Sequence, residues 1–224
     1  WDSQAEDEWA ETLDKAKFLQ AAQDFQLIET CRFTPLVGVE RLPLHIERLS
    51  RSAAALGFEL DIDALQSELG LVHSDHPSRI RVTLSRRGDL NITVAPLPPP
   101  TEVIRLSLAK APIDSSTIFT RHKTTHRQCY DAAEPLVPDA DDVLLFNEQG
   151  ELMETRIFNV FLVINGICWT PALSSGCLPG VYREQLLRAG AAQERTLTIK
   201  DLGAASQIFV TNSLRGQLRA EMMM

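Results

Sequence analysis

The stretch "PLPPP", residues 96–100, has four prolines in five positions and separates two parts of the sequence that differ in pattern. Proline lacks the backbone N–H that a helix or a central strand requires, so neither structure can run through this stretch. We therefore expect an interdomain linker at residues 98–102, between a small domain over residues 23–97 and a larger domain over residues 103–224. A proline-rich surface loop within one domain is the alternative.

The part before the prolines mixes strand and helix patterns. Residues 25–33 and a short segment around Val39 have the composition of strands, and residues 78–96 form two alternating runs joined by a turn, which predicts a hairpin. Residues 43–58, "PLHIERLSRSAAALGF", place apolar side chains on one face and predict a helix. A shorter helix is expected over residues 61–71, where an aspartate provides the cap.

The part after the prolines contains more strands than helices. Gly150 and the pair Asn165-Gly166 interrupt apolar runs in the manner of hairpin turns. Antiparallel hairpins with interspersed helices indicate the α+β class rather than one doubly wound parallel sheet. The expected elements are a strand at 103–109, a helix at 124–136, hairpins at 142–154 and 159–171, a helix at 179–192 and a strand at 207–213.

The composition argues against several classes of function. The formal net charge of −8 does not suit a broad surface for nucleic acid or for an anionic membrane. No stretch approaches the roughly 20 consecutive apolar residues of a membrane span, so we expect a soluble, cytoplasmic protein. The four cysteines are scattered without a C-x-x-C pair, and we therefore predict neither a metal site nor a disulfide framework.

Lys123 is the strongest catalytic candidate. It lies within "RHKTTHR", residues 121–127, and neighbouring positive charges lower the pKa of a lysine because they disfavour its ammonium form. A lysine that is neutral near pH 7 can form a Schiff base or act as a general base. An exposed basic turn is the alternative. The flanking residues are Arg121, His122, His126 and Arg127.

Three further motifs offer groups that suit a charged ligand. Residues 174–184, "SSGCLPGVYRE", begin a helix whose first free N–H groups, near Val181 and Tyr182, can bind a phosphate. Glu154 ends a strand, where it is either a solvated carboxylate or the partner of a cationic ring nitrogen. The last predicted strand ends in hydroxyl residues such as Ser213, which are either turn formers or ligand contacts.

The order of these motifs resembles the class IV aminotransferases, which are pyridoxal-phosphate enzymes of fold type IV. The resemblance runs from about residue 25 to the end of the chain, and it implies a two-domain α+β fold and a homodimer. The small N-terminal domain is α/β in this fold, and the larger C-terminal domain is mixed β with helices. The motifs are "HIERLSRSAAALGF" (45–58), "KTTHR" (123–127), "ETRIFNVFLV" (154–163), "SSGCLPGVYR" (174–183) and "TNSLRG" (211–216).

The resemblance implies a role for each candidate residue. Lys123 would carry the cofactor, pyridoxal 5'-phosphate, and move protons, while Glu154 would pair with the ring nitrogen and Leu178 would pack against the ring. The groups implied in binding the cofactor phosphate are Arg48, the backbone N–H groups of Val181 and Tyr182, and Ser213.

Two residues that follow Lys123, namely His126 and Arg127, bear on a further contact, the one to the phenolic oxygen of the cofactor. The family usually has asparagine where this chain has His126. The next position, Arg127, is tyrosine in the transaminases and arginine in many lyase-like members. Arg127 is therefore implied as a cofactor-binding residue of the lyase kind.

Within the family, Thr30 favours 4-amino-4-deoxychorismate lyase. It matches a threonine that is implicated in proton transfer in the lyase, whereas branched-chain transaminases typically have glycine there. The usual arginine motif that binds the lyase substrate is not evident in the small domain. The substitute that we identify is Arg81, in the predicted hairpin of residues 78–96.

The first residues give a second pointer to the lyase. Residues 5–19 place Trp9, Leu13 and Ala16 on one face of an expected amphipathic helix within a leading segment of residues 1–22. This segment resembles the one that joins the synthase component to the lyase domain in fused, bifunctional 4-aminobenzoate synthases. A fused or associated aminodeoxychorismate synthase component is the partner that this implies.

We therefore expect a lyase that converts 4-amino-4-deoxychorismate to 4-aminobenzoate and pyruvate, a step of folate biosynthesis. A D-amino-acid or branched-chain aminotransferase of the same family is the alternative. A lyase-like interaction module without catalytic activity is the alternative from another class, and the histidine at position 126 is the observation that favours it.

Overall fold

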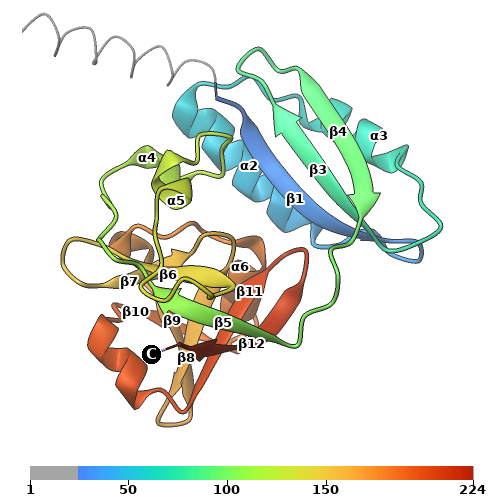
Figure 1. Cartoon of the computed structure of the whole chain (residues 1–224). Helices are drawn as coiled ribbons and strands as arrows, with labels where there is room; N and C mark the ends of the chain where they lie inside the picture. Colours follow the sequence, from blue (N-terminus) through green and yellow to red (C-terminus); the bar gives the residue numbers. More distant parts are fainter. Residues whose placement is uncertain (1–24, 224) are drawn as a thin grey trace, which may run out of the picture.

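Two β-sheets, one before the proline stretch and one after it, form the framework of the chain (Figure 1). A computed structural model of the chain describes residues 25–223, so the helix expected at residues 5–19 lies outside the described residues. Residues 97–102 join the last strand of the first sheet to the first strand of the second. We keep the domain boundary at residues 98–102 as a proposal, which this separation of the sheets supports.

The first sheet has four strands in the order β2-β1-β3-β4, and every pair of neighbouring strands in it is antiparallel. Two helices, α2 (Leu42–Leu56) and α3 (Ile62–Gly70), cover one face of it (Figure 1). The Asp61 carboxylate accepts a hydrogen bond from the Ala64 N–H at 2.9 Å, which confirms the predicted cap. The strands are β1 (Leu27–Thr34), β2 (Gly38–Val39), β3 (Ser78–Leu84) and β4 (Leu90–Pro96).

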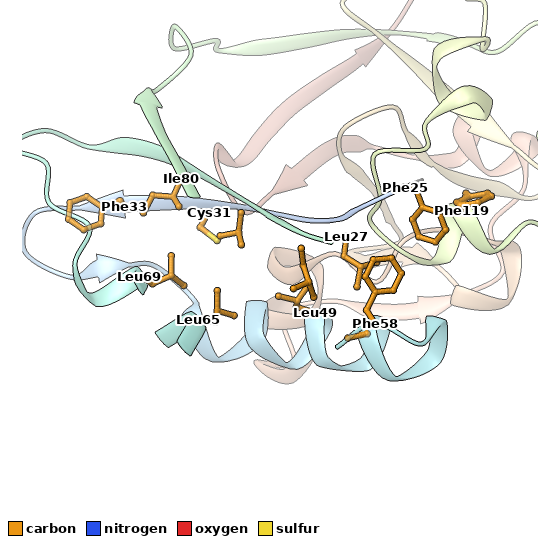
Figure 2. Close-up of a cluster of buried hydrophobic side chains, with 13 residues drawn as sticks. Phe25, Leu27, Cys31, Phe33, Leu49, Phe58, Leu65, Leu69, Ile80 and Phe119 are labelled. Carbon is orange, nitrogen blue, oxygen red and sulfur yellow. The ribbon is translucent and has the colours of Figure 1, made fainter. Parts of the chain in front are cut away.

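A hydrophobic core fills the space between this sheet and its helices. Figure 2 shows Leu49 of α2 and Leu65 of α3 beside buried residues of the strands, such as Ile80. The apolar face predicted for residues 43–58 is therefore the face that packs on the sheet. Phe119, from the part after the linker, meets Phe25 edge-on with the ring centroids 5.2 Å apart. The two parts of the chain consequently share core contacts.

The second sheet has eight strands in the order β10-β9-β8-β11-β12-β5-β6-β7. Both predicted hairpins, β6–β7 and β8–β9, pair antiparallel. The β8–β9 turn uses left-handed backbone at Asn165 (φ 52°) and Gly166 (φ 78°), as an Asn-Gly turn favours. β5 pairs in parallel with both β6 and β12, so the sheet is mixed. The strands are β5 (Val103–Leu108), β6 (Asp142–Phe146), β7 (Leu152–Thr155), β8 (Asn159–Ile164), β9 (Ile167–Pro171), β10 (Gln193–Arg195), β11 (Gln207–Asn212) and β12 (Gly216–Met222).

The helix predicted for residues 124–136 is wrong, because only α5 (Gln128–Asp131) is helical there. The backbone before α5 pairs with the start of β1 instead: the Ile28 N–H donates to the Lys123 carbonyl at 2.9 Å, and the Thr125 N–H donates to the Gln26 carbonyl at 2.9 Å. Thr124 forms an antiparallel bridge with Leu27, so the backbone here is paired like a strand and cannot be helical.

The remaining elements agree with the α+β class. Two further α-helices of the described chain are α4 (Ile118–Arg121) and α6 (Val181–Arg188). The helix predicted for residues 179–192 is confirmed in its central part, but α6 is shorter at both ends. All four cysteines are free, and Cys31 and Cys177 are buried. Between residues 25 and 223, no helix has the length and apolar character needed to cross a membrane.

Candidate active site

A cavity of about 290 Å³ lies between the two parts of the chain. Residues of β1, α2 and β3 line it from one side, and residues of the larger part line it from the other. Tyr182 is not among the residues that line it. The structure thus brings most of the predicted site together: Thr30, Arg48, Arg81, Lys123, Arg127, Glu154, Leu178, Val181 and Ser213.

Lys123 lies on the segment between α4 and α5 that pairs with β1, so backbone hydrogen bonds fix its position. Burial lowers the pKa of Lys123 to about 8, and the positive charges of Arg48 and Arg127 act in the same direction. Glu29 and Glu154 oppose them. The predicted direction of the shift is confirmed, and its main cause is burial rather than the flanking charges.

The residues that flank Lys123 play different parts. The His122 ring bonds to the Ser52 hydroxyl at 2.9 Å, and Arg121 is exposed. His126 stacks on the Phe119 ring with the centroids 4.0 Å apart, and it does not line the 290 Å³ cavity. Of the four, only Arg127 lines this cavity.

Glu154 lies next to the last residue of the buried strand β7, and three donors hold its carboxylate. The Tyr130 hydroxyl and the Leu178 N–H donate to Oε1 at 2.8 and 3.0 Å, while Asn159 Nδ2 donates to Oε2 at 3.2 Å. Burial raises the pKa of Glu154 to about 7, and the Tyr130 hydrogen bond is the largest opposing influence. In its ionised form this carboxylate can pair with a cationic ring nitrogen in the cavity.

Glu29 on β1 is a buried carboxylate that the sequence analysis did not identify. Arg48 donates to its two oxygens from Nε at 2.9 Å and from Nη2 at 2.6 Å, and His45 Nδ1 lies 2.5 Å from Oε2. Burial tends to raise the pKa of Glu29, but Arg48 and His45 outweigh this effect and lower it to about 2. The third nitrogen of Arg48, Nη1, donates to the Pro179 carbonyl over a long distance of 3.5 Å. Because this hydrogen bond is weak, Nη1 remains able to bind an anion.

Ser213, directly after β11, joins this network to the second part of the chain. Its Oγ lies 2.7 Å from His45 Nε2 and accepts a hydrogen bond from Arg41 Nε at 3.1 Å. Arg41 Nη2 also donates to the Ser213 carbonyl at 2.7 Å. The φ of Arg41 is 56°, a left-handed conformation that is uncommon outside glycine. The contacts with Ser213 hold this strained residue in place.

The start of α6 and the end of β11 meet at one end of the cavity. Gly180 precedes α6 and Val181 begins it, so the first N–H groups lack partners within the helix. The hydroxyl of Thr211 is buried, lines the cavity and has no hydrogen-bond partner among the described residues. An unpaired hydroxyl beside free backbone N–H groups and the Arg48 guanidinium fits a phosphate group.

Arginines give another region of the cavity a positive charge. Arg79 and Arg81 alternate with buried Ile80 on β3, so they share the face toward the cavity, and Thr30 on β1 lies opposite Arg81. Burial, Arg79 and Arg127 all lower the pKa of Arg81. Arg156 and Arg215 also line the cavity. This region therefore suits a ligand with more than one negative group.

Several side chains that shape the site were not predicted from the sequence. The alternation around Ile80 on a predicted strand was a usable signal for Arg79. The spacing of His45 and Arg48 on a predicted helix was another, since residues three apart share a face. No local pattern indicated Tyr130, because the helix predicted for residues 124–136 forms only at Gln128–Asp131 and so does not show which side chains face the cavity. The missed residues are Glu29, Arg41, His45, Arg79, Tyr130, Asn159 and Thr211.

Comparison with known proteins identifies the family. A model of the amino-transferase class IV family matches residues 26–221. A provisionally named aminodeoxychorismate lyase of Schizosaccharomyces pombe is 32% identical over 193 residues, which cover 78% of this chain and 80% of that protein. The aminodeoxychorismate lyase of Saccharomyces cerevisiae is 27% identical over 188 residues, which cover 63% of this chain and 50% of that protein.

Solved structures add both lyases and aminotransferases. A provisionally named amino-acid aminotransferase from Mesorhizobium loti superimposes with a TM-score of 0.81 at 41% identity, covering 89% of this chain and 100% of that one. A provisionally named 4-amino-4-deoxychorismate lyase from Legionella pneumophila gives 0.78 at 27% identity, covering 88% of this chain and 82% of that one. Because the similar proteins include both lyases and aminotransferases, the substrate has to be inferred from the residues of the site.

Substitution of the buried carboxylate tests its role in stability. We expect Glu29→Gln to lower the free energy of unfolding by about 3–5 kcal/mol in urea titrations, because Arg48 is left buried without its counter-charge. Glu47→Gln is the matched control, since Glu47 pairs with Arg188 on the surface, and its cost should be much smaller. Equal costs for the two variants would contradict this role.

The pH dependence of the wild type provides a second measurement of the same carboxylate. The pKa of Glu29 is about 2 in the folded chain and 4.5 ordinarily, so its contribution is complete above pH 4.5. It should fall away as the pH drops toward 2. Glu29→Gln should lack this component of the acid destabilisation.

Gly180 is a position where the packing of the site leaves no room for a side chain. A Cβ there would overlap the side-chain amide of Asn159, which holds Glu154. We expect Gly180→Ala to lower the free energy of unfolding by about 1–3 kcal/mol through overpacking. Gly203→Ala is the control, because a Cβ at Gly203 meets no atom within 4 Å. A Gly180→Ala variant as stable as the control in urea would refute the close approach.

Proposed function

Because the chain belongs to the amino-transferase class IV family, we propose that it is a pyridoxal-phosphate-dependent lyase that converts 4-amino-4-deoxychorismate to 4-aminobenzoate and pyruvate. The observation that carries the choice of substrate is the group of arginines on one side of the cavity, Arg79 and Arg81 above all. The lyase relatives in two yeasts agree with it.

The residues of the cavity fit pyridoxal phosphate, as the unpaired Thr211 hydroxyl and the available nitrogen of Arg48 indicate. When bound, this cofactor withdraws electrons from the substrate carbon that carries the amino group. Leu178 lines the cavity and would pack against the ring. The cavity residues that would hold the phosphate are Arg48, Val181, Thr211 and Ser213, with Val181 acting through its backbone N–H group. The backbone N–H of Tyr182, which does not line the cavity, stays a prediction.

Lys123 would attach the cofactor and then act as the base. An amine with a pKa of about 8 is partly unprotonated near neutral pH, so it can take the proton from the carbon that carries the substrate amino group. Burial beside Arg48 and Arg127 keeps this amine a free base more often than an exposed lysine.

Glu154 would accept a hydrogen bond from the protonated ring nitrogen. Its carboxylate lines the cavity, and Oε2 has a single donor among the described residues, Asn159. An ionised carboxylate at this position keeps the ring nitrogen protonated, which strengthens its withdrawal of electrons.

The arginines favour the lyase because its substrate carries two carboxylates. Arg79 and Arg81 share one face of β3, and Arg127 lies near Arg81. A branched-chain amino acid brings one carboxylate and an apolar side chain, which would leave much of this positive charge without a partner. Two carboxylates on one ligand can engage several guanidinium groups at once.

Thr30 lies opposite Arg81 in the pairing of β1 with β3, and both residues line the cavity. A carboxylate held by Arg81 would therefore lie close to the Thr30 hydroxyl. We assign to Thr30, together with Lys123, the delivery of a proton to the departing pyruvate. Loss of pyruvate makes the six-membered ring of the substrate aromatic, and this gain in stability drives the step.

An aminotransferase is the second candidate, and the 41% identity to the Mesorhizobium loti structure favours it. The two activities would share Lys123, Glu154 and Arg48 and differ in the contacts to substrate. A catalytically inactive module is less consistent with the family and with an arrangement in which all three residues line one cavity. A homodimer, a cytoplasmic location and association with a synthase component stay predictions.

The proposed reaction is tested by incubating the chain with pyridoxal phosphate and aminodeoxychorismate and measuring 4-aminobenzoate. We expect Lys123→Ala to form no product above the uncatalysed rate and to lose the borohydride-reducible bond to the cofactor, because the amine is gone. Lys110→Ala is the control, since Lys110 pairs with Glu134 at the surface. Amino transfer to a 2-oxo acid without any 4-aminobenzoate would refute the lyase.

The arginines predict a change in substrate affinity. We expect Arg81→Gln to raise KM for aminodeoxychorismate at least about tenfold, because a hydrogen bond to a charged group contributes about 1.5–3 kcal/mol. Cofactor affinity should stay within about twofold of the wild type. Arg105→Gln is the matched control, because Arg105 is exposed and pairs with Asp141. An unchanged KM in Arg81→Gln would place the substrate carboxylates elsewhere.

A further inference from the structure

Tyr130 is a buried residue of the site to which the family resemblance assigned no role. It lies on α5, seven positions after Lys123, and it lines the cavity. Its hydroxyl is 2.8 Å from Glu154 Oε1 and 3.4 Å from the Thr120 carbonyl. A hydroxyl has one proton to donate, and the shorter distance to a carboxylate indicates where the proton points.

We propose that Tyr130 is a positioning residue that keeps Glu154 ionised and fixes which of its oxygens faces the ligand. The inference rests on the proposed function in one respect, namely that the ligand of Glu154 is the ring nitrogen of the cofactor. The effect of Tyr130 on Glu154 itself belongs to the protein without cofactor and can be measured there.

The geometry divides the two oxygens of Glu154 between different tasks. Oε1 accepts both the Tyr130 hydroxyl and the Leu178 N–H, so its two lone pairs are used. Oε2 accepts only Asn159 Nδ2 within residues 25–223, at the longer distance of 3.2 Å. One lone pair of Oε2 therefore remains for a donor in the cavity.

The hydrogen bond also favours the ionised form of Glu154. Burial raises the pKa of this carboxyl group to about 7, and the Tyr130 hydroxyl is first among the influences that lower it. Without that donor the pKa would rise further, so a larger fraction of the carboxyl groups would be protonated at neutral pH and would lack the negative charge that pairs with a protonated ring nitrogen. The charged or titratable side chains near Glu154 are Lys123, Arg127, Arg48, Cys129 and Cys177.

Tyr130 is itself held as a donor. Burial and the nearby Glu154 raise the pKa of its hydroxyl well above the usual value, so it stays protonated wherever Glu154 titrates. The Arg127 guanidinium covers its ring at 4.6 Å, and Arg127 Nη2 donates to the Arg156 carbonyl at 2.5 Å. The arginine at this position therefore acts on the site through the tyrosine as well as by its own charge.

The test is an infrared titration of the cofactor-free protein, in which the C=O band of protonated Glu154 is assigned by its absence in Glu154→Gln. We expect Tyr130→Phe to move the midpoint upward by about one pH unit, a tenfold change in proton affinity. An unmoved midpoint would overturn the proposal. This readout does not depend on the reaction, so it separates the inference from the proposed function.

Cofactor affinity supplies the second readout. We expect Tyr130→Phe to weaken pyridoxal-phosphate binding about tenfold near pH 7 and to recover at higher pH, where Glu154 ionises without help. In a Glu154→Gln background, the same substitution should leave the pH dependence of binding unchanged. Weakening that is equal at every pH would mean a merely structural tyrosine and would contradict the proposal.

A third variant guards against failure of Tyr130→Phe to fold. Replacing both tyrosines of the chain with a fluorinated tyrosine makes the hydroxyl a stronger donor of nearly the same size. The Glu154 midpoint should then move downward. An upward or absent shift would overturn the proposal, and Tyr182→Phe in the same labelled protein confines the effect to Tyr130.

Discussion

The buried carboxylate of Glu29 is the constraint on which the rest of the site depends. It neutralises Arg48 and forms a hydrogen bond with His45, whose own pKa is lowered by burial, and the other ring nitrogen of His45 then contacts Ser213 in the second part of the chain. Removal of one charge from such a group leaves the others buried without compensation. The same network thus fixes α2 against β1, joins the two parts and leaves one nitrogen of Arg48 toward the cavity.

Two groups with opposite requirements share the cavity. Burial lowers the pKa of Lys123 to about 8 and raises that of Glu154 to about 7, so both can change charge near neutral pH. Surrounding contacts then set each one separately: Arg48 and Arg127 favour the free amine, and Tyr130 favours the ionised carboxylate. Titratable groups whose environments are arranged in this way are typical of catalytic sites.

Much of the fold could be predicted from the sequence because it rests on local signals. The apolar face of α2, the Asp61 cap and the Asn165-Gly166 turn all have short-range patterns, and the family resemblance is confirmed by the match over residues 26–221. The helix expected at residues 124–136 failed because this backbone pairs with β1 from far away in the chain. Glu29 and Tyr130 could not be predicted from the sequence for the same reason: their partners are brought together only by folding.

Whether the cavity serves a lyase with a dicarboxylate substrate is decided by the stoichiometry of a reaction with aminodeoxychorismate and bound pyridoxal phosphate, run without any 2-oxo acid acceptor. We expect pyruvate and 4-aminobenzoate in equal amounts over many turnovers. A reaction that stops after one turnover and needs a 2-oxo acid to resume would contradict this expectation and identify an aminotransferase.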